Sequence, residues 1–155
     1  MNIVPSSIRV KKLDLKSLDV LDSSLELMYF GWKGMTREAD EFLSTYGLSR
    51  AHHRILFTIA RRDGVTIGEL QENLGISKQA MHRPLKQLLD MGAVVVSRNP
   101  SKHRFKLLHL TELGRQIEQG ASDRERSVMR AAFVQAGDDA REAWLAVMAV
   151  AAENA

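Results

Sequence analysis

A mainly α-helical chain with one small β-hairpin is the fold class that the sequence predicts. Apolar residues recur at helical spacing over most of the 155 residues, and capping residues separate the helical segments. One β-branched run is followed by a basic turn and a second apolar run, which is typical of a hairpin. The hydrophobic content of 45% and the charged content of 26% suit a single globular domain spanning residues 1–155.

The first predicted helix follows residues 1–17, which show no clear period. Apolar residues recur at helical spacing over residues 25–46. Gly31 and Gly34 inside this segment weaken the prediction of an unbroken helix. A second helix is predicted to begin at Ser49 and to stop at the run RRDG.

Two short helices joined by a tight turn come next. The first begins at a capping box, in which Glu69 stands three residues after Thr66, and ends at Gly75. Only the run GIS separates it from a helix over residues 78–91 that Ser77 caps. Two helices joined in this way form a helix-turn-helix.

Pro84 lies in the middle of the second of these helices. A proline there removes the hydrogen bond to the carbonyl of Ala80 and costs about 3 kcal/mol. One interpretation is a kinked helix from Lys78 to Met91, and the other is a loop followed by a helix that starts at Pro84. Apolar residues on a common face favour the kinked helix, since each contributes roughly 1.5–3 kcal/mol when buried. They are Met81, Leu85, Leu88 and Leu89.

A hairpin and two further helices complete the chain. Residues 93–98 are rich in valine and predict a strand, the run NPSKH predicts a basic turn, and RFKLLHL predicts the return strand. The predicted fold is therefore a helix-turn-helix followed by a hairpin. A long helix is expected from Thr111 through Phe133, softly interrupted around Gly120–Ser122, and a last helix starts near Asp138.

Positive charge is concentrated in the predicted helix-turn-helix and hairpin. Residues 49–115 carry a net charge of +7 and all five histidines, whereas the rest of the chain carries −4. Such a segregation is expected where a polyanion binds. The polar face of the second short helix offers Ser77, Lys78, Gln79, His82 and Arg83. In a major groove, arginine pairs with guanine and glutamine with adenine, while lysine and serine suit phosphates. The runs that predict the basic turn and the return strand add Lys102, His103 and Arg104.

Residues 47–114 resemble the MarR family of bacterial transcriptional regulators, most specifically in the runs TIGEL, LGISKQA and LTELG. The resemblance implies a winged helix-turn-helix DNA-binding part at about residues 48–110, with dimerisation helices at about 18–47 and 111–155. It implies a homodimer on a palindromic operator in double-stranded DNA, with a recognition helix in each major groove and Arg104 in the minor groove. Lys102 departs from the acidic residue that the family usually carries in the wing, and Pro84 is also not typical.

Many members of that family lose DNA affinity when a small aromatic acid binds, so the resemblance implies a repressor that such an effector releases. The residues expected to line an effector pocket are Tyr29, Trp32, Met35 and His52. The run AWLAVMAVAA is apolar nearly all round, which favours a helix buried in a homodimer.

Other classes of function find little support. The sequence has no cysteine, so thiolate metal sites and thiol redox switches are excluded. Catalytic and phosphate-loop motifs are absent. His52 and His53 are adjacent on a helix and point about 100° apart, so they cannot chelate one metal ion together. We therefore expect no enzyme, no catalytic residue, no cofactor and no metal.

The N-terminus lacks the apolar core of a secretory signal, and the longest apolar run has ten residues where about 20 span a bilayer. A cytoplasmic protein without a membrane partner is expected. One alternative function stays open: a winged-helix module that binds an acidic protein partner and has no sequence-specific DNA binding. Salt-dependent retardation by duplex DNA distinguishes the two functions.

Overall fold

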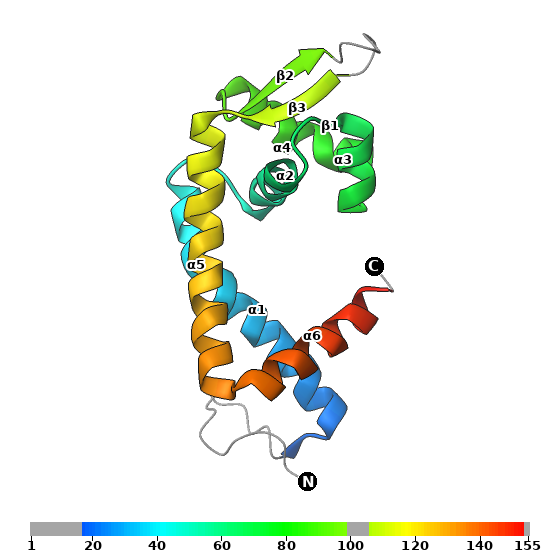
Figure 1. Ribbon diagram of the computed structural model, residues 1–155, viewed down its shortest axis with the longest axis vertical. Coiled ribbons are helices and arrows are strands. Elements are labelled where there is room, and N and C mark those ends of the chain that lie inside the picture. The colour runs from blue at the N-terminus through cyan, green and yellow to red at the C-terminus, as the bar shows by residue number, and fades with distance from the viewer. Residues whose placement is uncertain (1–16, 99–105, 154–155) are drawn as a thin grey trace.

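The computed structural model describes residues 17–98 and 106–153, which form two regions joined by one long helix (Figure 1). In chain order the elements are α1 (Val20–Ser44), α2 (Arg50–Arg61), β1 (Val65–Thr66), α3 (Ile67–Leu74), α4 (Lys78–Asp90), β2 (Val94–Arg98), β3 (Lys106–Leu110), α5 (Glu112–Ala136) and α6 (Asp138–Ala152). One region holds α2, α3, α4 and the sheet, and the other holds α6 and most of α1. Helix α5 runs from the sheet to α6 and packs against both α1 and α2. None of these helices combines the length and apolarity that a membrane span needs.

The expected hairpin is confirmed, and it belongs to a three-stranded antiparallel sheet in the order β1-β3-β2. In the hairpin Val95 is opposite His109, and on the other edge of β3 Val65 is opposite Leu108. The sequence pattern did not indicate β1, because a two-residue strand is too short to show alternation.

Helix α1 begins earlier than the apolar pattern indicated. The side chain of Asp19 caps it, since Oδ1 accepts hydrogen bonds from the backbone N–H groups of Leu21 at 2.8 Å and Asp22 at 2.9 Å. The helix runs unbroken through Gly31 and Gly34. Residues 1–16, which belong to the segment without a clear period, lie outside the described residues.

Helix α4 is continuous through Pro84, so the interpretation of a loop followed by a helix starting at Pro84 is wrong. Met81, Leu85 and Leu88 are all buried in the core, as the continuous apolar face predicted. The burial of these side chains offsets the hydrogen bond that the proline removes.

The soft interruption expected in the long helix around Gly120–Ser122 is also wrong, because α5 is unbroken there. These small residues lie where α5 packs most closely on α1. A Cβ atom at position 120 would lie 2.4 Å from Cζ of Phe42, and Ala121 is fully buried. The small side chains therefore serve close helix packing.

The core lies between α2, α3, α4, the sheet and the facing parts of α1 and α5. It includes Leu43, Ile55, Leu70, Leu108 and Ile117. Helix α6 contrasts with it, because Val147 and Val150 are about two-thirds exposed and no residue of the helix is buried. The apolar side chains of α6 thus remain open to contact beyond this chain.

Candidate nucleic-acid interface

The turn between α3 and α4 is held by two caps. Gly75 ends α3 in the left-handed conformation, with φ of +61°, which favours glycine. Ser77 begins α4, and its Oγ accepts a hydrogen bond from the backbone N–H of Ala80 at 3.1 Å. At the other end of α3, the predicted capping box between Thr66 and Glu69 is formed in both directions. Together these caps define the angle between the two helices.

The outer face of α4 brings together all five residues predicted there. Ser77, Lys78, Gln79, His82 and Arg83 are all exposed. In the described part of the chain, no carboxylate forms an ion pair with Lys78 or Arg83, whereas Lys86 is paired with Asp90 one turn later. The first half of α4 therefore presents unneutralised cations, and its second half contacts the core.

The hairpin, which we call the wing, follows α4 in the chain and contacts it through β2. Its base is the pair of β2 and β3, which ends where Arg98 is opposite Lys106. Lys102, His103 and Arg104, the predicted wing contacts, lie outside the described residues.

A hydrogen-bonded chain that the sequence pattern did not indicate crosses the wing's base. His109 of β3 lies between two partners: its Nδ1 is 2.9 Å from Oδ1 of Asp63, and its Nε2 is 2.9 Å from Oγ of Ser97. Asp63 belongs to the turn after α2, and Ser97 belongs to β2. These hydrogen bonds therefore tie the hairpin to the turn after α2. No local pattern could have shown it, because His109 and Asp63 are 46 positions apart.

The run LTELG fixes the junction between the sheet and α5. Oγ1 of Thr111 donates to the carbonyl of Gly92 at 2.7 Å and accepts from the N–H of Gly114 at 3.1 Å. A Cβ atom at position 114 would lie 2.0 Å from the carbonyl oxygen of Ala93. Only glycine permits this approach of α5 to the turn that follows α4.

The four predicted pocket residues lie on two helices. Tyr29 and Trp32 of α1 are 58% and 52% exposed, and Met35 is half-buried. The guanidinium of Arg50 lies 5.1 Å from the centre of the Trp32 ring and also pairs with Asp40.

His52, the fourth of these residues, is buried, and its hydrogen-bond partners lie elsewhere. Its Nδ1 accepts from the backbone N–H of Ser49 at 3.1 Å, and its Nε2 lies 3.0 Å from Oε1 of Gln87. Burial lowers the pKa of His52 below the usual 6.5, and the hydrogen bonds to Gln87 and Ser49 offset part of this effect. His52 therefore links α2 to α4, a role that the sequence pattern did not indicate.

A buried polar cluster joins α2 to α5. Ser122 donates to the carboxylate of Glu118 at 2.6 Å and lies 3.1 Å from Nε2 of His53. The carboxylate also accepts a hydrogen bond from Arg61 at 2.8 Å. Burial lowers the pKa of His53, while the charge of Glu118 raises it in part. Burial raises the pKa of Glu125, whose carboxylate lies 3.7 Å from Nδ1 of His53.

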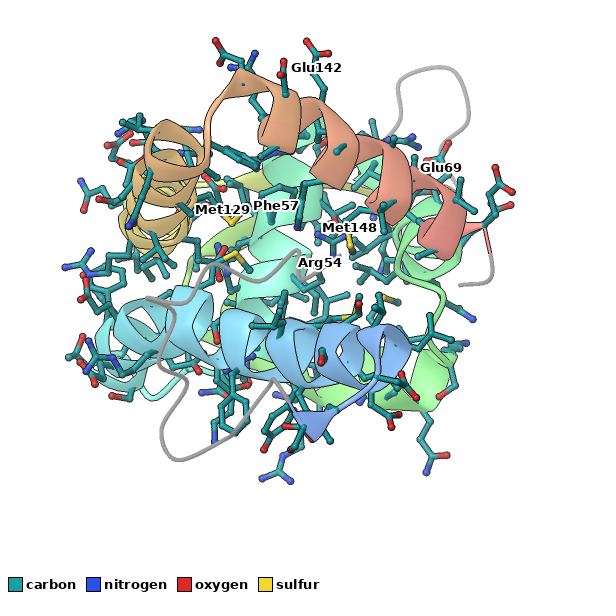
Figure 2. The ribbon with its side chains drawn as sticks, turned by 90° about the horizontal axis from the view of Figure 1, so that it is seen from below. Arg54, Phe57, Glu69, Met129, Glu142 and Met148 are labelled. Atoms are coloured by element: carbon teal, nitrogen blue, oxygen red, sulfur yellow. The ribbon has the colours of Figure 1, made fainter. Side chains whose placement is uncertain are left out.

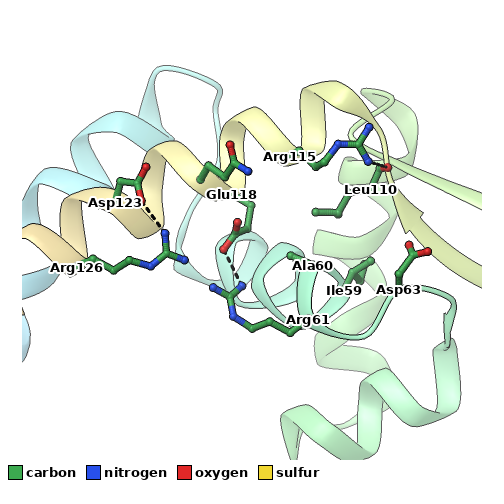
Figure 3. Close-up of a pocket in the computed structure, with 10 residues that line it drawn as sticks. Ile59, Ala60, Arg61, Asp63, Leu110, Arg115, Glu118, Asp123 and Arg126 are labelled. Carbon is green, nitrogen blue, oxygen red and sulfur yellow. Dashed lines mark hydrogen bonds and ion pairs between the residues drawn. The ribbon is translucent and has the colours of Figure 1, made fainter.

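A cavity of about 620 Å³ lies beside this cluster, between α2, the end of β3 and α5 (Figure 3). Its charged lining contains three arginines and three acids, namely Arg61, Asp63, Arg115, Glu118, Asp123 and Arg126. Figure 3 shows Arg61 reaching from α2 to Glu118, and Arg126 paired with Asp123 along α5. The two signs balance, so this cavity does not favour one ligand charge.

A smaller cavity of about 210 Å³ between α2 and α3 has a different character. Its charged lining residues are Arg54, Arg61 and Arg62. The guanidinium carbons of Arg54 and Arg61 lie 5.3 and 3.3 Å from the centre of the Phe57 ring. In Figure 2, which shows the molecule from below, Arg54 and Phe57 are seen between the ribbons of α1 and α6.

No cluster of three or more metal-binding side chains occurs in residues 17–98 and 106–153. The arrangement with a clear chemical use is therefore the cationic, hydrogen-bonding face of α4 beside the wing, which suits a phosphate backbone and base edges.

The chain is similar to known transcriptional regulators. The sequence model of the MarR family matches residues 46–104. The HTH-type transcriptional regulator PetP of Rhodobacter capsulatus is 38% identical over 120 residues, a match that covers 77% of this chain and 72% of that protein. The uncharacterized HTH-type transcriptional regulator YdgJ of Bacillus subtilis is 32% identical over 87 residues, covering 56% of this chain and 53% of that protein.

Solved structures share the fold at lower sequence identity. A MarR transcriptional regulator from Methanosarcina mazei Go1 matches with a TM-score of 0.70 and 21% identity, over 88% of this chain and 91% of that one. The transcriptional repressor CouR, bound to a 23-mer DNA duplex, matches with a TM-score of 0.67 and 23% identity, over 94% of this chain and 99% of that one.

Proposed function

The chain belongs to the MarR family of transcriptional regulators, and from this premise we propose that it binds a palindromic operator as a homodimer. In the proposed complex α4 enters the major groove, Arg83 and Gln79 contact bases, and Lys78 and Ser77 contact phosphates. His82 adds a donor or acceptor, and Lys102, His103 and Arg104 extend the contact from the wing. The observation that carries the proposal is the exposed, unneutralised face on the first half of α4.

The exposed apolar surface supports the homodimer. Apolar side chains are exposed on α6 and also on the first half of α1, where Leu25 and Met28 are each more than half exposed. Apolar faces of this kind on two elements of the same region resemble one half of a permanent dimer interface. A two-fold dimer then accounts for a palindromic site, because each copy of α4 reads one half.

We further propose that the protein represses transcription and that a small aromatic acid releases it from DNA. The exposed rings of Tyr29 and Trp32, with Arg50 beside Trp32, support a contact with an aromatic anion. Met35 and His52 complete the proposed pocket. Salicylate-like anions should then weaken DNA binding and change the fluorescence of Trp32, whereas aromatic amines of similar size should do neither.

Selection of bound duplexes from random DNA tests the DNA-binding proposal. The expected result is a palindromic site whose half-sites lie about one helical turn apart. Recovery of no enriched sequence, together with no salt-dependent retardation by duplex DNA, would instead favour the module that binds an acidic protein partner. Sedimentation of the same sample tests the dimer: Val147→Glu in α6 should yield monomer or unfolded chain, whereas Val95→Lys on β2 should leave the dimer intact. A folded wild-type monomer at micromolar concentration would contradict the proposed assembly.

A further inference from the structure

One side chain of α4 ties this helix to two other parts of the molecule. Nε2 of Gln87 donates to the carbonyl of Gly47 at 3.0 Å, and Oε1 of Gln87 lies 3.0 Å from Nε2 of His52. Gly47 belongs to the turn that follows α1, and His52 lies in α2. The amide of Gln87 thus connects α4 to the turn after α1 as well as to α2.

The surrounding hydrogen bonds determine the direction of both contacts. Since the backbone N–H of Ser49 donates to Nδ1 of His52, that nitrogen is the acceptor in the neutral ring, and Nε2 carries the proton. Nε2–H therefore donates to the oxygen of Gln87, which leaves the amide N–H of Gln87 to donate to Gly47. Each donor meets an acceptor in only one orientation of the amide.

The hydrogen bonds of Gln87 resist rotation of α4 about its axis, which the apolar contacts of the helix do not. The burial of Met81, Leu85 and Leu88 fixes how deeply α4 packs, but apolar burial has no preferred direction. Hydrogen bonds weaken steeply with misalignment, so they resist rotation of the helix about its axis. Arg83 stands about one turn before Gln87, and a rotation that breaks the Gln87 bonds also displaces Arg83. Base recognition by a bidentate arginine depends on that orientation.

We propose that Gln87 is a positioning residue, which holds α4 at the angle where Arg83 and Gln79 read bases by binding Gly47 at the end of α1 and His52 in α2. The inference rests on the proposed DNA-binding function. It also gives the end of α1 a direct connection to the reading helix, independent of the core.

Three variants test the inference on the full-length protein with the selected operator and with random DNA. Gln87→Met keeps the length and the helix propensity of the side chain but removes both hydrogen bonds. Gln87→Glu keeps the acceptor for His52 and removes the donor to Gly47. Gln116→Met is the matched control, because Gln116 is also an exposed helical glutamine and its side-chain partner, Glu112, lies in its own helix.

We expect Gln87→Met to bind the operator about tenfold more weakly, equivalent to ~1.4 kcal/mol, with less than about a twofold change on random DNA. Its unfolding midpoint in urea should fall only slightly below that of Gln116→Met, because Gln87 is exposed and water can take over the bond to Gly47. Gln87→Glu should lose operator affinity to an intermediate extent. Gln116→Met should bind both DNAs as the wild type does.

Two results would overturn the inference. In one, both Gln87 variants keep the wild-type ratio of operator to random affinity. In the other, both affinities fall together with the unfolding midpoint, which is the behaviour of a merely structural residue. Failure of the wild type to prefer any sequence would instead count against the proposed function, so the two failures are distinguishable.

Discussion

The guanidinium of Arg61 donates to the buried carboxylate of Glu118 at 2.8 Å, across the junction of α2 and α5. Arg61 also stacks on Phe57, with its guanidinium carbon 3.3 Å from the ring centre. The pair therefore joins the DNA-binding region to the long helix that leads to α6.

Removal of Arg61 should destabilise the protein, because Glu118 is only 4% exposed and would keep an uncompensated charge. We expect Arg61→Ala to lower the free energy of unfolding by about 2 kcal/mol, near the low end for buried pairs because Arg61 itself is partly exposed. Arg126→Ala, which breaks the exposed pair with Asp123, should cost less than about 1 kcal/mol. Urea unfolding measures both, and equal losses would contradict a special role of the Arg61–Glu118 pair.

Gly114 should not tolerate a side chain. In Gly114→Ala the new Cβ atom would lie 2.0 Å from the carbonyl oxygen of Ala93, so α5 must move away from the turn after α4. We expect a loss of about 2 kcal/mol or more in unfolding free energy, as for other overpacked sites. Gly68→Ala in α3 is the control: its Cβ meets nothing within 4 Å, so alanine should be neutral or mildly stabilising. Thermal denaturation measures the stability of both variants. A Gly114→Ala variant as stable as Gly68→Ala would contradict the prediction.

The two kinds of DNA contact on α4 should separate in binding experiments. Arg83→Ala should cost roughly 1–3 kcal/mol on the operator and little on random DNA, because it removes a base contact. Lys78→Ala should weaken both DNAs about equally, and the slope of log affinity against log salt should flatten by about one unit for each phosphate that is no longer neutralised. Titrations at several salt concentrations measure these quantities. The assignment is wrong if both variants lose the same affinity on both DNAs.

The buried histidines predict that the protein loses stability in mild acid. The pKa values of His52 and His53 are lowered by burial, so below pH 6.5 the unfolded chain binds more protons than the folded one. The stabilising contribution of the two neutral histidines should therefore be fully present above pH 6.5. The free energy of unfolding should fall as the pH decreases from 6.5 toward the lowered pKa values.

Glu125 changes the stability with pH in the opposite direction. Burial raises its pKa, so just above pH 4.5 the folded state binds more protons than the unfolded chain. His53→Gln separates the contributions, because it should reduce the slope of unfolding free energy against pH below pH 6.5 while Glu125 is retained. An unchanged slope in this variant would show that His53 is not the group responsible.

Local sequence patterns predicted the helices and their order well. The caps at Thr66 and Ser77 and the apolar face of α4 depend only on residues within one or two turns. The same face determined that α4 continues through Pro84. The polar residues on the outer face of α4 follow from this spacing, since exposed and buried positions alternate with the helical period.

What the sequence by itself determined is therefore the set of helices, the hairpin and the cationic face of α4, because periodicity, capping and charge are short-range properties. Only the tertiary structure decided which distant groups meet: Arg61 with Glu118 at a separation of 57 residues, and Gln87 with Gly47 at 40. It also decided that α5 stays unbroken at Gly120, where the ring of Phe42 fills the space of a side chain. Such contacts depend on how helices pack in space, and a single local segment carries no information about its packing partner.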